Sequence, residues 1–235
     1  MCSVAIVTAL EREVRPLIRH WRVSEREYGG RGFRFFENRN VVLVCGGIGA
    51  EAARRAAEAV IALYEPKVVY SAGFAGALDA ALHVGDIIQP RCVIDAGDGS
   101  RIGRQQGSGA LVSFATVASP AQKAKLRNSF SAQAVDMEAA AVARAAEARG
   151  IEFAAVKVIS DEVDFNFPAL ERFVDSSGRF SETRFALFVA LRPWLWLRVA
   201  TLARNSNRAS RVLCDWLEKM AARPVAHAAA NAFDR

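Results

Sequence analysis

The chain has 235 residues, of which 52% are hydrophobic and seven are prolines, so it can bury a substantial core and is not a disordered chain. This length fits one large domain or a domain with an appendage. The net charge is +6, but no zinc module, RNA-recognition signature or helix-turn-helix pattern accompanies it, which disfavours nucleic acid as a partner.

The N-terminal segment is predicted to form strands. Ser3–Thr8 is an apolar, β-branched run, long enough for a buried strand and too short for a helix, and we expect it to end at an acidic turn over residues 11–13. Phe33–Glu37 and Val41–Cys45 flank a short polar segment and predict a hairpin. We therefore expect three strands before the first helix.

Two glycine-rich segments surround the first predicted helix. Gly46–Gly49 precedes Ala50–Tyr64, whose many alanines predict a helix. A helix that begins behind glycines offers free amides to an anion or to a closely approaching ligand. Lys67–Ser71 predicts a buried strand that runs into Ala72–Gly76, which we expect to be a loop where the backbone can approach a ligand.

The second half of the chain is predicted to continue the alternation of strands and helices. Strands alternating with helices favour a three-layer α/β fold with a central mixed, mostly parallel sheet. The predicted strands are Val84–Ile88, Leu111–Val117, the segment carrying Val135 and Asp136, and Phe153–Ile159; the predicted helices are Pro120–Asn128 and Ala139–Arg149.

Three acidic residues lie at the ends of predicted strands: Asp136, Glu138 and Asp161. One acid after a strand is more often a helix cap or a surface charge. Three in equivalent places are more informative, because open α/β sheets bind ligands at the carboxyl ends of their strands. Asp161 could exchange a proton with a base nitrogen, and Glu138 has two oxygens that could accept hydrogen bonds from a vicinal diol.

Other chemistries find no support in the sequence. The glycine segment lacks the spacing of a dinucleotide fingerprint or a P-loop, no serine lies in GxSxG, and the three histidines fall in unrelated places. The four cysteines form no CxxC pair, so we expect no metal, and we expect a reducing, cytoplasmic compartment.

Five motifs in order resemble those of the nucleoside phosphorylase superfamily, and the nearest branch resembles the methylthioadenosine/S-adenosylhomocysteine nucleosidases. The resemblance covers roughly residues 3–165 and implies an α/β fold, no metal or redox cofactor, a homodimer, and cleavage of a purine N-ribosidic bond. The motifs are Thr8–Val14, Gly46–Gly49, Ser71–Gly76 with Val84–Asp86, Val135–Glu138 and Val158–Asp161.

The resemblance also implies roles for individual residues. Glu13 matches the carboxylate that activates the attacking water, and Met137 and Glu138 match the pair that holds the ribose. Asp161 matches the acid that protonates the departing adenine, with Ser160 orienting it. Asp161 is therefore expected to be at least partly protonated in a site shielded from water, since adenine leaves poorly without a proton. The glycine positions Gly49 and Gly73 are expected to lie against the substrate.

Four positions depart from the patterns of the superfamily, and three of them, Phe74, Lys157 and Glu13, bear on the nucleophile. Phe74 stands where nucleosidases of the branch use a serine, and Lys157 stands where they use an arginine, both to hold the water. Asp136 replaces a more usual glutamate. Glu13 stands where a phosphate-binding arginine would be expected in phosphorylases, which favours hydrolysis, although phosphate remains possible as the nucleophile.

Residues 166–235 are expected to form a helical extension of the domain formed by residues 1–165. Six arginines and no acid lie between Arg184 and Arg211, among tryptophans such as Trp194 and Trp196. The apolar run Phe185–Leu191 is too short to cross a bilayer. We expect these helices to pack on the domain or on a second subunit, with peripheral binding at the inner membrane face as the alternative.

The predicted function is a purine nucleosidase that releases adenine from a derivative such as methylthioadenosine or S-adenosylhomocysteine. The extension is similar to that of the hopanoid-associated phosphorylases, which keeps adenine release from adenosylhopane open as an alternative. An alternative of another class is a non-catalytic purine-nucleoside-binding protein.

Overall fold

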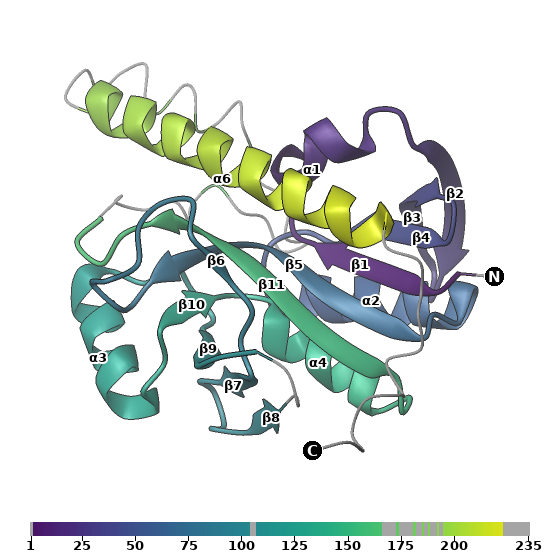
Figure 1. Cartoon of the computed structure of the whole chain (residues 1–235), viewed down its shortest axis with the longest axis horizontal. Helices are drawn as coiled ribbons and strands as arrows, with labels where there is room; N and C mark the ends of the chain where they lie inside the picture. The colour runs from purple at the N-terminus through teal and green to yellow at the C-terminus, as the bar shows by residue number, and fades with distance from the viewer. Residues whose placement is uncertain are drawn as a thin grey trace, which may run out of the picture.

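The computed structural model describes residues 2–103, 107–165 and 195–222, together with Phe173, Ser181, Phe185, Phe188 and Arg192. A mixed sheet of 11 strands lies between helices on both faces (Figure 1). This confirms the predicted three-layer α/β fold with a mixed sheet. The strands are β1 (Val4–Thr8), β2 (Arg22–Tyr28), β3 (Arg31–Asn38), β4 (Val41–Cys45), β5 (Val68–Ala77), β6 (Ile87–Ile88), β7 (Cys92–Asp95), β8 (Arg101–Gly103), β9 (Ala110–Ser113), β10 (Ala134–Asp136) and β11 (Glu152–Asp161).

The sheet contains two groups of parallel strands, and its edges are antiparallel. The strand order is β2-β3-β4-β1-β5-β10-β9-β7-β8, and β11 pairs with β5 and β6. Strand β5 runs parallel to both β1 and β11, whereas β10 pairs with β5 in the antiparallel sense. The parallel strands β1, β5 and β11 therefore bring their carboxyl ends to one edge of the fold.

The helices between these strands are close to their predicted bounds. Helix α2 is Ala50–Tyr64, as predicted, and α4 is Ala139–Glu147. Helix α3, Pro120–Phe130, begins with a capping box in which Ser119 accepts from the Gln122 amide and Gln122 accepts from the Ser119 amide.

The segment after β1 differs from the prediction. Residues 11–13 open a helix, α1 (Glu11–Ile18), instead of an acidic turn. Two glutamates in its first turn suit the positive end of a helix. Pro16 lies inside this helix and has no N–H, which removes the donor that the Arg12 carbonyl would receive in a regular helix. The hydroxyl of Ser210, far along the chain, donates to that carbonyl at 3.4 Å.

The glycine segment Ala72–Gly76 is also different from the prediction, because it is strand and not loop. It forms the second half of β5 and pairs with Val156–Asp161 of β11, with a register shift between Ile159 and Asp161. Pairing with the long neighbour β11 along its whole length holds this glycine-rich segment extended. The prediction that a ligand approaches the backbone of this segment now applies to a strand.

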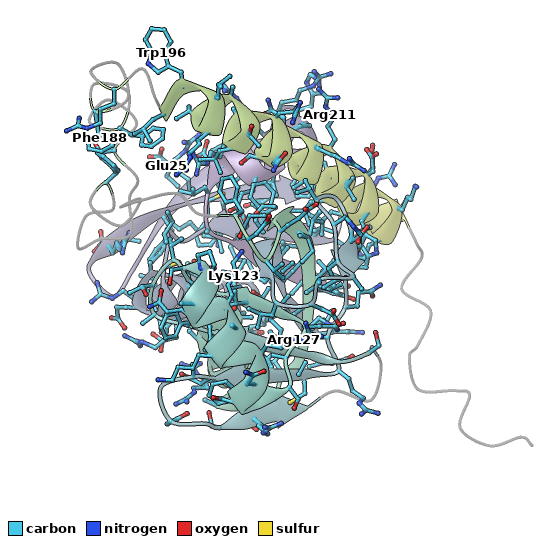
Figure 2. The ribbon with its side chains drawn as sticks, turned by 90° about the vertical axis from the view of Figure 1, so that its left-hand side faces the viewer. Glu25, Lys123, Arg127, Phe188, Trp196 and Arg211 are labelled. Atoms are coloured by element: carbon cyan, nitrogen blue, oxygen red, sulfur yellow. The ribbon has the colours of Figure 1, made fainter. Side chains whose placement is uncertain are left out.

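The C-terminal helix α6 (Trp196–Ala222) has two unlike halves (Figures 1 and 2). Its second half buries Ala209, Leu213 and Leu217 against α1 and β11. At the start of its first half, Leu197 is 84% exposed and Trp196 is 56% exposed. Among the described residues, no helix combines the length and the apolarity that crossing a membrane requires. Trp194 lies outside the described residues.

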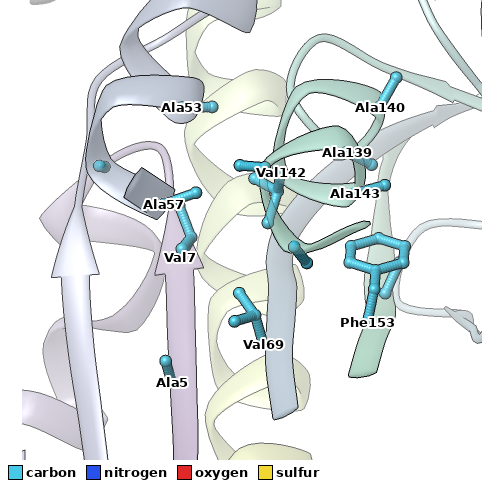
Figure 3. Packing of buried hydrophobic residues seen from close by; sticks show 14 of the residues in the cluster. Ala5, Val7, Ala53, Ala57, Val69, Ala139, Ala140, Val142, Ala143 and Phe153 are labelled. Atoms are coloured by element: carbon cyan, nitrogen blue, oxygen red, sulfur yellow. The ribbon is translucent and has the colours of Figure 1, made fainter. Parts of the chain in front are cut away.

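The two faces of the sheet bury different side chains, as alternation along a strand requires. On one face Ala5, Val7 and Val69 pack with the alanine-rich helices α2 and α4 (Figure 3). On the other face Ile6 packs with a cluster that includes Leu213 of α6. The helix of the extension thus shares a core with the sheet.

Candidate active site

A cavity of about 400 Å³ opens beside the carboxyl ends of β1, β5 and β11. Two of the predicted site residues, Gly73 and Lys157, do not line it and lie behind its wall. The structure brings the other seven together at the cavity: Glu13, Gly49, Phe74, Met137, Glu138, Ser160 and Asp161.

Glu13 comes from the first turn of α1, directly after β1. Its carboxylate is buried and accepts a hydrogen bond from the Thr8 hydroxyl, at 2.6 Å from Oε2. Burial raises the pKa of Glu13, and this outweighs the Thr8 hydrogen bond and the nearby Lys157 ammonium, which lower it. A carboxylate whose pKa is raised is a better proton acceptor.

Glu138 occupies the position before α4, two residues after the end of β10. Its Oε1 accepts the backbone amide of Gly49 at 2.9 Å, and its Oε2 accepts that of Met137 at 3.3 Å. These bonds join the glycine segment before α2 to the β10–α4 junction. Burial raises the pKa of Glu138 to about 7, opposed by Lys157 and assisted by the negative charge of Asp136.

Lys157 and Asp136 form a fully buried ion pair beneath the cavity. Lys157 Nζ lies 2.9 Å from Asp136 Oδ2, and the two side chains are 2% and 0% exposed. Asp136 also accepts the Ser113 hydroxyl at 2.6 Å and the Ala139 amide at 2.8 Å. Burial alone would lower the pKa of Lys157, but the carboxylates of Asp136, Glu138 and Glu13 raise it above its ordinary value. The lysine therefore stays charged and keeps its ion pair with Asp136.

Asp161 ends β11 at the cavity, and both of its oxygens accept hydrogen bonds. Ser160 donates to Oδ1 at 2.8 Å, while Lys123 of α3 donates to Oδ2 at 2.5 Å. The structure thus adds Lys123 as a direct neighbour of Asp161. That Asp161 is at least partly protonated stays a prediction.

Gly73 and Gly76 of β5 make room for these carboxylates. A Cβ at Gly73 would lie 3.1 Å from Glu13 Oε2, and one at Gly76 would lie 2.8 Å from Asp161 Oδ2. Gly73 also has φ +152. The absence of a side chain at these glycines lets Glu13 and Asp161 lie close to β5. Gly73 was expected to lie against the substrate, but in the structure it lies against Glu13.

Several cavity residues are missing from the sequence prediction. Lys123 gives no sequence signal, because lysines on a helix are usually exposed. Phe185 and Leu202 from the extension also line the cavity, as do Phe74 and Val117. Among the described residues, no three histidines, cysteines or acids are arranged to hold a metal.

The family model described as the phosphorylase superfamily matches residues 3–120 and 107–191. The chain belongs to the phosphorylase superfamily. A 5′-methylthioadenosine/S-adenosylhomocysteine nucleosidase of Staphylococcus aureus (strain JH9) is 26% identical over 222 residues, covering 76% of this chain and 97% of that protein. One of the same name from Marinomonas sp. (strain MWYL1) is 33% identical over 92 residues, and this match spans 37% of the chain and 39% of that protein.

Solved structures of nucleosidases have the same fold. The 5′-methylthioadenosine/S-adenosylhomocysteine nucleosidase of Helicobacter pylori, complexed with a pyrrolidine inhibitor, superposes with a TM-score of 0.69 at 18% identity and covers 94% of this chain and 97% of that one. The enzyme of that name from Colwellia psychrerythraea, in complex with adenine, gives 0.59 at 26% identity, covering 68% and 83%. Coverage of 94% includes much of the extension, so structural similarity goes beyond the residues 3–165 that carry the motif resemblance.

Proposed function

We propose that this protein is a purine nucleosidase that hydrolyses the N-ribosidic bond of an adenosine derivative and releases adenine. The observation that carries the proposal is the convergence of Glu13, Glu138 and Asp161 on one cavity from three separate strand ends. Membership of the phosphorylase superfamily and similarity to methylthioadenosine/S-adenosylhomocysteine nucleosidases support it. The substrate class we propose is the one those relatives are named for.

Glu13 is proposed to activate the water. The water oxygen forms a bond to the anomeric carbon of the ribose while the bond to the base nitrogen breaks, and Glu13 takes the water proton. Its raised pKa and its buried position suit that proton transfer. A nearby carboxylate also stabilises the positive charge that develops on the sugar.

Glu138 and Met137 are proposed to hold the ribose. Glu138 has two oxygens for two hydroxyls, and the amides of Gly49 and Met137 already fix their direction. With a pKa of about 7, Glu138 gains its charge most readily when hydroxyl donors replace the lost hydration. Nucleoside binding is therefore expected to release a proton at neutral pH.

Asp161 is proposed to transfer a proton to the departing adenine, with Ser160 fixing the rotation of its carboxyl group. Phe74 occupies the wall where related nucleosidases are expected to carry a water-holding serine. We infer that Glu13, fixed by its hydrogen bond from Thr8, holds the water instead, and that Lys157 acts from behind the wall by keeping Asp136 in place.

The test is release of adenine from methylthioadenosine, S-adenosylhomocysteine and adenosine, each with and without phosphate. Hydrolysis predicts release without phosphate and free ribose derivatives as products. Release that requires phosphate would make the enzyme a phosphorylase. Binding of adenosine without cleavage of any substrate, including an adenosylated lipid, would favour the non-catalytic binding protein. Activity that survives exhaustive treatment with a chelator would support the absence of a metal cofactor.

A second candidate substrate is an adenosine attached to a lipid, such as adenosylhopane. The observation that favours it is the contribution of Phe185 and Leu202 to the cavity, together with the exposed Trp196 and Leu197 at the start of α6, the helix that carries Leu202. Arginines without acids along this segment suit a peripheral contact with anionic lipid. Faster cleavage of the lipid-linked nucleoside than of methylthioadenosine, with cosedimentation on anionic vesicles, would establish this candidate.

Two further expectations belong with this proposal. We propose a homodimer, which analytical ultracentrifugation checks directly. We also propose the division into residues 1–165 and an extension of residues 166–235. Because Leu213 and Leu217 of α6 belong to the core, a chain cut at residue 165 is expected to lose stability even if the α/β part is complete.

A further inference from the structure

Lys123 is a buried cation that the catalytic scheme above leaves without a role. Its side chain is 3% exposed, and it lies one turn before Arg127 on α3 (Figure 2). Nζ donates to Asp161 Oδ2 and to the Glu162 carbonyl, each at 2.5 Å. Among the described residues, Asp161 is the carboxylate in ion-pair contact with this lysine. A buried lysine that faces the proposed acid calls for a chemical explanation.

The space for this pair is built into the sheet. Gly76 of β5 lies beneath it, and a Cβ there would stand 2.8 Å from Asp161 Oδ2 and 3.3 Å from Lys123 Nζ. Both Lys123 and Asp161 line the cavity. A ligand in the cavity therefore meets the pair as a unit, with Ser160 bonded to the remaining carboxylate oxygen.

We propose that Lys123 stores the proton that Asp161 passes to the departing base. This inference rests on the proposed function. The resting pair, ammonium and carboxylate, holds one proton, which is the same number as an amine beside a carboxylic acid. As the base leaves, the proton moves from Lys123 Nζ to Asp161, and a proton moves from Asp161 to the base nitrogen.

The step balances without another reactant. The base gains one proton, Lys123 becomes a neutral amine, and Asp161 ends as the carboxylate with which it began. Water loses its proton to Glu13 as its oxygen bonds to the ribose. Exchange with solvent then returns a proton to Lys123 and removes one from Glu13. Because Lys123 acts through Asp161, it is a positioning residue whose specific property is that it can give up a proton.

Other charged groups surround the pair, and the test has to keep them constant. Glu13, Asp136 and Glu138 line the same cavity, as does Arg12. On the outer side of α3, Arg127 pairs with Asp79 at the surface. Glu162 follows Asp161 and meets Lys123 through its carbonyl. Substitutions at position 123 alone leave all of these groups in place.

The experiment compares Lys123→Met, which removes the proton, with Lys123→Arg, which keeps the charge but does not give up a proton. Lys125→Met is the matched control, because Lys125 lies on the same helix and is exposed. Adenine release from methylthioadenosine, or from whichever adenosine derivative the wild type cleaves, is measured against pH for all four proteins. Circular dichroism checks that each one folds.

At neutral pH, both substitutions at position 123 are expected to reduce kcat by about 100-fold or more, which is the scale of a general acid, while the control stays near wild type. Lys123→Met is expected to regain activity at acidic pH, where an unpaired aspartic acid carries its own proton. Full activity of Lys123→Arg, or an unchanged pH profile in Lys123→Met, would overturn the proposal. If the arginine variant does not fold, the pH profile of the methionine variant decides.

Adenine binding separates this proposal from the proposed function. If the wild type cleaves a nucleoside and Lys123→Met keeps its rate and profile, the function stands and the role of Lys123 fails. If the wild type cleaves nothing, calorimetry with adenine still reports on the pair. Adenine is then expected to bind Lys123→Met about tenfold more weakly at neutral pH, with recovery at acidic pH, because one donated hydrogen bond is lost. Equal adenine affinity would overturn the proposal.

Discussion

Two lysine–aspartate pairs lie at this cavity, one beneath it and one in its wall. In the lower pair, Lys157 and Asp136 are 2% and 0% exposed. In the wall pair, Lys123 is 3% exposed and Asp161 is 24% exposed. In the first pair only Asp136 belongs to the cavity lining, and its side chain is fully buried, whereas both residues of the second pair line the cavity.

The difference in access is matched by a difference in hydrogen bonding. Asp136 receives Ser113, Ala139 and Lys157, so its oxygens are fully used within the protein. Burying two charges is costly unless such bonds accompany them. Asp161 receives Lys123 and Ser160, and its partial exposure leaves room for one more contact. We therefore expect the lower pair to stabilise the fold and the wall pair to transfer a proton.

The largest expected effect concerns the lower pair. Lys157→Met leaves Asp136 buried without its cation, and we expect a loss of about 3–5 kcal/mol in the free energy of unfolding. Urea denaturation measures it. The double variant Lys157→Met with Asp136→Asn is expected to lose less than the sum of the two single changes. Additive losses would show that the two residues do not act as a pair.

The wall pair is expected to affect turnover more than stability. Asp161→Asn keeps the shape of the side chain but removes proton transfer, so kcat is expected to fall by about 100-fold or more. Asp79→Asn is the matched control, since Asp79 pairs with Arg127 of the same helix at the surface. Turnover of Asp161→Asn within a factor of about two of wild type would remove the role proposed for Asp161.

Glu138, which lies at the same cavity as the two pairs, is expected to make the stability of the protein depend on pH. Its pKa is about 7 in the folded protein against an ordinary value of 4.5. A group with a raised folded pKa favours folding at low pH, and that contribution is lost as pH rises from 4.5 to about 7. The melting temperature of the wild type is thus expected to fall across this window, with Glu13 acting in the same direction.

Glu138→Gln removes the ionisable group, and with it the contribution of Glu138 to the pH dependence of stability. The wild type is expected to lose about 2 kcal/mol more than the variant across the window. Thermal melts at several pH values measure the difference, with Glu147→Gln, an exposed acid of α4, as the control. Parallel curves for wild type and Glu138→Gln would contradict the raised pKa.

Helix α2 and the acids at the strand ends are predictable because their signals in the sequence are local. The alanines of Ala50–Tyr64 predict α2 to the residue, since helix propensity acts within a turn. Asp136, Glu138 and Asp161 come at the ends of apolar strands, where α/β sheets bind ligands, so the sequence singles out these acids. Their meeting also depends on the antiparallel pairing of β10 with β5, which the sequence does not reveal.

Other features depend on contacts that no local pattern reveals. Strand β2 was missed because its residues are mostly polar and exposed, as suits an edge strand. Helix α1 contains Pro16 and is completed by Ser210, which lies far away in sequence. Lys123 and Lys125 look alike in the sequence, and tertiary packing alone makes the first buried and the second exposed.

The smallest expected effect tests how closely the wall pair is fitted to the sheet. Gly76→Ala places a Cβ 2.8 Å from Asp161 Oδ2 and 3.3 Å from Lys123 Nζ, so the pair has to shift. We expect turnover to fall about tenfold, equivalent to about 1.4 kcal/mol in the activation barrier. Steady-state kinetics measure it.

Gly32→Ala is the control for this change, because Gly32 lies in β3 with open space around its missing Cβ. It adds the same methyl group to a strand without approaching a charged pair, and turnover is expected to stay near wild type. If Gly76→Ala is equally silent, the pair tolerates displacement, and the distinction between a rigid lower pair and a precisely held wall pair is lost. If Gly76→Ala loses turnover while its stability is unchanged, catalysis depends on the close contact between β5 and Asp161.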